Sequence, residues 1–161
     1  MDVPLSLIER SLSNSLKYEV RFAKCTKFKK SRIFRCWVSD GPSYLPEVLL
    51  VKMARQTKRE PYDRERNYIG SSAWKLCNEW AALQFLSEIN GDKMITPKFI
   101  AGDAIQGLIA FEYVSRARSF RDILRKSNAA ERAHALLAHA QVMGRMHGST
   151  YGRKKEWHAS N

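Results

Sequence analysis

Lys52 and Glu79 are the two side chains of this sequence best suited, by type and position, to handle a phosphate group. Lys52 lies in the apolar run Leu49-Leu-Val-Lys-Met-Ala54. Strand alternation puts it on the same face as Leu50. A lysine that emerges from an apolar strand can neutralise nucleotide phosphates, and a carboxylate such as Glu79, in the middle of a predicted helix, can pair with it and orient it. The alternative is that both side chains simply point into water.

A basic turn precedes these residues in the chain. The segment Cys25-Thr-Lys-Phe-Lys-Lys-Ser-Arg32 contains no glycine, the residue that lets backbone amides approach a phosphate closely. Lys30, the Ser31 hydroxyl and the neighbouring cations could bind phosphate through their side chains instead. It is equally consistent with the sequence that this charged turn is simply exposed to solvent and binds nothing.

The elements that must position these residues follow from apolar periodicity, capping residues and turn signals. Helices are predicted over residues 3–16, 72–89, 119–127 and 129–147, and strands over 18–28, 32–39, 47–54, 98–102 and 107–114. This order predicts an α+β fold. A lobe made of an antiparallel sheet and one long helix is followed by the first helices of a helical lobe.

Composition indicates a globular protein that attracts polyanions. The 161 residues are 44% hydrophobic, and 28 Lys and Arg against 16 Asp and Glu give a net charge of +12. Three cysteines, Cys25, Cys36 and Cys77, are too few and too scattered to predict a disulfide framework or a metal site. With no secretory signal and no membrane-spanning run at the start or elsewhere, a cytoplasmic, reduced protein is expected.

Five motifs occur in an order that resembles the protein-kinase-like superfamily, and within it the aminoglycoside phosphotransferase and choline kinase group. They are Val51-Lys52, Asn78-Glu-Trp-Ala-Ala-Leu83, Thr96–Gly102, Phe111–Val114 and Met143–Gly152, within a resemblance that covers about residues 15–153. The resemblance implies a kinase-like N-terminal lobe over residues 1–112. Residues 113–161 would then be the hinge and the first helices of an incomplete C-terminal lobe.

The resemblance also implies a role for each matching residue. Lys52 would contact the α- and β-phosphates of ATP, and Glu79 would pair with it. Phe111 would guard the back of the adenine pocket. The backbone carbonyl of Glu112 and the backbone amide of Val114 would bind the adenine edge.

Two further expectations come from the resemblance. Val38 or Val51, with other apolar side chains of the first strands, would cover the adenine ring. The family transfers phosphate with an aspartate in a His-Gly-Asp-like loop, a nearby asparagine and a later metal-binding aspartate, whereas no aspartate follows Asp122. No catalytic or metal-binding residue is therefore assigned, and Mg²⁺ is expected only if a second lobe exists.

Three functions fit these observations. The leading one is the ATP-binding lobe of an aminoglycoside-phosphotransferase-like small-molecule kinase, not catalytic as this chain. The second is a complete noncatalytic, pseudokinase-like binding module. In either case a missing lobe or a partner chain would cover the apolar stripe of the helix Ala129–His147, unless that stripe packs on the preceding helix. The third is a basic nucleic-acid-binding protein, in which Phe28, Phe34 and Trp37 among the cations of Lys24–Arg35 would stack on bases.

Overall fold

The computed structural model describes residues 5–28, 32–56, 61–90 and 96–155. The fold is α+β, as predicted, and every predicted helix and strand is present, although several ends differ. The elements in chain order are α1 (Leu5–Leu16), β1 (Arg21–Lys27), β2 (Ile33–Asp40), β3 (Val48–Met53), α2 (Ser72–Asn90), β4 (Phe99–Asp103), β5 (Leu108–Glu112), α3 (Phe120–Lys126) and α4 (Ala129–Thr150).

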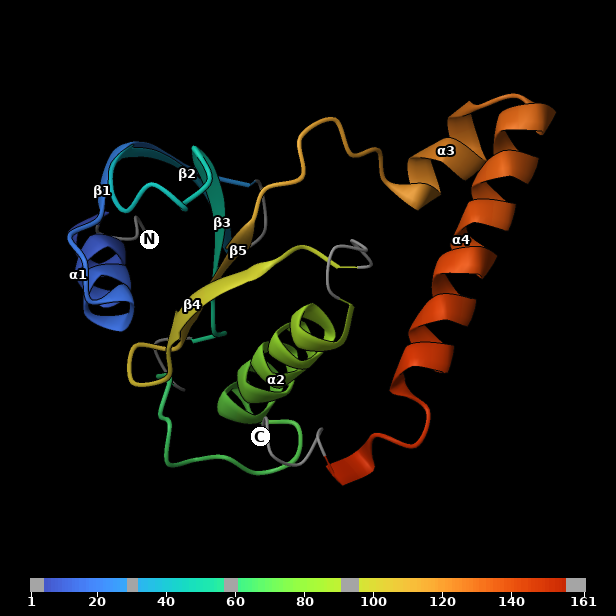
Figure 1. Cartoon of the computed structure of the whole chain (residues 1–161). Coiled ribbons are helices and arrows are strands. Elements are labelled where there is room, and N and C mark those ends of the chain that lie inside the picture. The colour runs from blue at the N-terminus through green and yellow to red at the C-terminus, as the bar shows by residue number, and fades with distance from the viewer. Residues whose placement is uncertain (1–4, 29–31, 57–60, 91–95, 156–161) are drawn as a thin grey trace.

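The five strands form one antiparallel sheet in the order β1-β2-β3-β5-β4 (Figure 1). β3 lies at the centre of this sheet. Its residue Lys52 is paired with Ile33 of β2 on one side and with Ile109 of β5 on the other. A side chain at this position is therefore held between strands on both sides, rather than at a sheet edge.

The two faces of the sheet are covered by different helices. α1 lies against one face, and its Ile8 and Leu12 belong to the same buried core as Leu49 and Val51 of β3. α2 covers β4 and β5 on the other face, where Leu50 is part of the packed cluster. Because successive strand residues point to opposite faces, Lys52 lies on the α2 side together with Leu50, which confirms the predicted alternation.

Cys25 and Cys36 form a disulfide between β1 and β2. The two residues face each other in the β1–β2 register, with Cα atoms 4.1 Å apart. The prediction that the cysteines are separate and reduced is thus wrong for this pair, because strand pairing, not sequence spacing, brings the two sulfurs together. Cys77 is a free thiol. With this disulfide, cysteine content no longer argues for a reducing compartment.

α3 and α4 form a helical hairpin that stands beside the sheet and is joined to β5 by residues 113–119 (Figure 1). Ser119 caps α3. Its Oγ accepts a hydrogen bond from the Asp122 amide and donates one to the Asp122 carboxylate, and this hydrogen bond lowers the pKa of Asp122. Within the described residues, no helix combines the length and apolar character that a membrane crossing requires.

Candidate functional site

The structure brings Lys52 and Glu79 together as an ion pair between β3 and α2. Glu79 follows Leu76 by three residues, so both lie on the helix face that is turned toward the sheet. The two side chains are 35% and 34% exposed. The pair is therefore formed at the border of the packed cluster, where a solvent-borne ligand can still reach it.

The ion pair lines a cavity of about 450 Å³ between the end of β3 and the first turns of α2. Of the described residues that line it, four are cationic and one, Glu79, is a carboxylate. The cations are Arg32, Lys52, Arg55 and Lys75. Sequence reasoning named Lys52 and, as a cation of the basic turn, Arg32. It assigned no role to Arg55 or Lys75, because only the tertiary fold brings their segments together.

The cations of this cavity differ in how firmly they are held. Arg32 donates hydrogen bonds to the backbone carbonyls of Ala54, at 2.8 Å, and Gln56. Its guanidinium group is therefore fixed at the cavity wall. Arg55 and Lys75 are exposed, and neither forms an ion pair within the part of the chain that the structure describes. Their charge is available to an anionic ligand.

Lys30 and Ser31, the predicted phosphate ligands of the basic turn, lie outside the described residues. The ends of that turn are described. The Phe28 amide donates to the Ile33 carbonyl at 3.0 Å, which closes the β1–β2 hairpin beside Arg32.

The residues predicted to surround adenine, Phe111, Glu112 and Val114, lie at the end of β5 and just after it. Phe111 is buried in the cluster that α2 forms with the sheet. The Glu112 amide donates to the Lys98 carbonyl at 2.9 Å. Val114 is half-buried, and within the described part of the chain its amide donates no hydrogen bond. That amide can therefore bind a ligand acceptor, as the resemblance implies.

The expectation that Val38 or Val51 covers an adenine ring is wrong. Val51 is fully buried beneath α1, and Val38 packs against the same core. The strand alternation that puts Lys52 on the α2 side puts its neighbour Val51 on the other side. Arg35 and Trp37 of β2 lie on the α2 side of the sheet instead.

Arg35 is surrounded by aromatic rings on this face. Its guanidinium carbon lies 4.7 Å from the ring centroid of Trp37, 5.2 Å from that of Tyr113 and 5.9 Å from that of Phe28. It also donates a hydrogen bond of 3.0 Å to the Tyr113 hydroxyl. This cluster ties the segment after β5 to β2 and offers planar groups on which a flat ring could stack. The signal that could have identified it is the alternation of Arg35 and Trp37 in β2.

Gly102 of β4 lies so close to the Trp80 ring that a side chain at this position must displace the ring. A Cβ at position 102 would lie 2.5 Å from Cζ3 of Trp80. That ring packs on the ring of Phe99, with centroids 5.5 Å apart. Trp80 directly follows Glu79 in the chain. We expect Gly102→Ala to lower the free energy of unfolding by about 1–3 kcal/mol through overpacking, as measured by urea denaturation.

Gly144→Ala is the matched control for this substitution. Gly144 lies inside α4, and nothing would lie within 4 Å of a Cβ there. Alanine in a helix interior is favoured over glycine, so we expect the free energy of unfolding to rise by about 0.5–1 kcal/mol. Equal losses in the two variants would contradict the close packing at Gly102.

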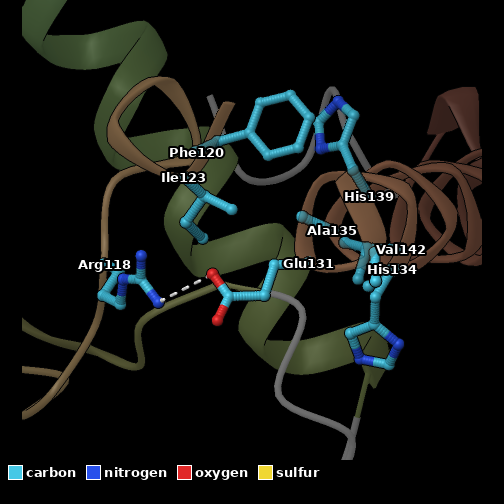
Figure 2. Close-up of a pocket in the computed structure, with 10 residues that line it drawn as sticks. Arg118, Phe120, Ile123, Glu131, His134, Ala135, His139 and Val142 are labelled. Carbon is cyan, nitrogen blue, oxygen red and sulfur yellow. Dashed lines mark ion pairs between the residues drawn. The ribbon is translucent and has the colours of Figure 1, made fainter. Parts of the chain in front are cut away.

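A second cavity, of about 740 Å³, lies between α3 and α4 and is mainly apolar. Figure 2 shows Phe120 stacked on His139, with ring centroids 4.7 Å apart, and the ion pair of Arg118 with Glu131, at 3.9 Å. The described residues that line this second cavity form no cluster of cations like that around Lys52.

Two leucines of the apolar stripe of α4 do not pack on α3. Leu136 and Leu137 are 52% and 60% exposed, whereas Ala135, His139 and Val142 face the cavity that α3 helps to form. The alternative that this stripe packs on the preceding helix is therefore wrong for the two leucines.

Among the described residues, no group of three or more His, Cys, Asp or Glu side chains is placed to hold a metal ion. Comparison of the chain with family models, with curated proteins and with solved structures found no match.

Proposed function

We propose that this chain is a nucleotide-binding lobe of the protein-kinase-like type, similar to that of the aminoglycoside phosphotransferase group, and that it binds ATP. The observation that carries this proposal is the Lys52–Glu79 ion pair between the third strand and the next helix. In protein kinases a lysine on the third strand and a glutamate on the following helix must pair for productive nucleotide binding.

The other parts of the site fit one orientation of the bound nucleotide. The phosphates would contact Lys52 and the basic cavity at the end of β3. The base would lie toward Val114, whose amide is available, and toward the rings of Trp37 and Tyr113. Phe111 would close the back of the site. By itself this chain would bind the nucleotide without transferring its phosphate, and a second lobe would supply the catalytic aspartates of a small-molecule kinase.

ATP titration of the whole chain by isothermal calorimetry tests this proposal. We expect Lys52→Ala to weaken ATP binding at least about tenfold, because the charge nearest the phosphates is lost. Lys98→Ala is the matched control, since Lys98 is exposed and does not line the cavity, and it should leave the affinity unchanged. Circular dichroism confirms that each variant is folded. Failure of the unsubstituted chain to bind ATP at about 1 mM would refute the proposal.

A nucleic-acid-binding function is the second candidate, and the exposed aromatic face favours it. Phe28 is 42% exposed, and Lys24 lies 5.5 Å from the Trp37 ring centroid. Phe34, the third residue of the predicted stacking set, is buried in the core and cannot take part. A steep fall of single-stranded RNA affinity with salt, unaffected by ATP, would favour this function over the nucleotide site.

The exposed leucines of α4 fit either a missing lobe or a partner chain. Leu136 and Leu137 form an apolar surface that the described part of the chain leaves uncovered. The same helix would serve in a complete kinase or in a noncatalytic binding module, so it does not distinguish the two.

A further inference from the structure

We propose that the cavity at the end of β3 binds a phosphate chain free of divalent metal, held by Lys52, Arg55 and Lys75 rather than through Mg²⁺. This inference rests on the proposed function and names the form of ligand that the site takes. It also adds Arg55 and Lys75 to the residues that contact the phosphates.

The charge of the cavity is the first argument. Among the described residues, four cations line it and one carboxylate, Glu79, which is already paired with Lys52. Mg²⁺ in phosphate sites is usually held by one or two protein carboxylates together with the phosphates. The donor set here does not fit that ion, whereas it complements the full negative charge of an uncomplexed phosphate chain.

The placement of the cations is the second argument. Lys52 lies near the end of β3 and Arg55 just after it, and Lys75 lies one helical turn before Glu79 on α2, so that cations stand on both walls of the cavity. Ser72, at the start of α2, also lines it. A chain of phosphates can thus contact several cations in succession without a metal ion to join them.

The absence of competing partners is the third argument. In the described part of the chain, Arg55 and Lys75 form no ion pair, and Arg32 is fixed by the carbonyl of Ala54. The cavity therefore has an excess of positive charge, because Arg55 and Lys75 have no acidic partner among the described residues. An anion with several charged oxygens would neutralise it.

Calorimetric titration with ATP and with inorganic tripolyphosphate, in EDTA and in MgCl₂ at matched ionic strength, tests the inference. We expect Mg²⁺ to weaken the binding of both ligands by at least about fivefold, because it neutralises part of their charge. Arg55→Gln and Lys75→Gln should each weaken binding in EDTA by about threefold or more, whereas Lys98→Gln should not.

The outcomes separate this inference from the function on which it rests. Tighter ATP binding with Mg²⁺, or Arg55 and Lys75 variants that match the Lys98 control, would overturn the metal-free site while leaving ATP binding intact. Tripolyphosphate that binds as tightly as ATP would support the phosphate site and argue against a nucleotide function. No binding of either ligand in either buffer would overturn both.

Discussion

Replacing Leu12 by alanine should lower the free energy of unfolding by about 2–5 kcal/mol. Leu12 lies on α1 and is fully buried, in one core with Val20, Leu49 and Val51. Truncation removes apolar contact area and leaves a cavity that a core of strand residues cannot easily fill. Urea denaturation followed by circular dichroism measures the change.

Leu137→Ala is the matched control for Leu12→Ala. Leu137 lies on α4 and is 60% exposed, so the same chemical change should alter the free energy of unfolding by no more than about 0.5 kcal/mol. Equal effects at the two leucines would mean that α1 does not pack on the sheet. Because α1 covers the face opposite Lys52, the ATP affinity of folded Leu12→Ala should match that of the unsubstituted chain.

Reduction of the Cys25–Cys36 disulfide should lower the free energy of unfolding by about 2–3 kcal/mol. The bridge closes a loop between residues 11 apart in sequence, and a crosslink of this length stabilises mainly by restricting the unfolded chain. Urea denaturation with and without a phosphine reductant measures the difference. The double variant Cys25→Ala, Cys36→Ala should lose the dependence on reductant.

Cys77 provides the control for this experiment. It is the free thiol of the three cysteines, so Cys77→Ser should retain the full effect of the reductant. Alkylation of the unreduced, denatured protein followed by mass spectrometry should label Cys77 alone. Labelling of all three cysteines, with no effect of reductant on stability, would contradict the pairing.

The sequence determined the elements of this protein and the face of the sheet on which Lys52 lies. Apolar periodicity, capping residues and turn signals are local properties, so they identify helices and strands without knowledge of the fold. Strand alternation is also local, and it placed Lys52 on one face of the sheet. Applied to Val51, the same rule would have excluded that residue from an adenine site.

Only the tertiary structure decided which distant residues meet. The disulfide depends on the register that places Cys25 opposite Cys36, and the aromatic cluster depends on how the segment after β5 carries Tyr113 toward Arg35. The basic cavity likewise joins the end of β3 to the start of α2, which are well separated along the chain. Each of these contacts depends on the packing of the sheet and helices. Bringing together residues that are far apart in sequence costs conformational entropy, and sequence spacing alone does not show which of them will meet.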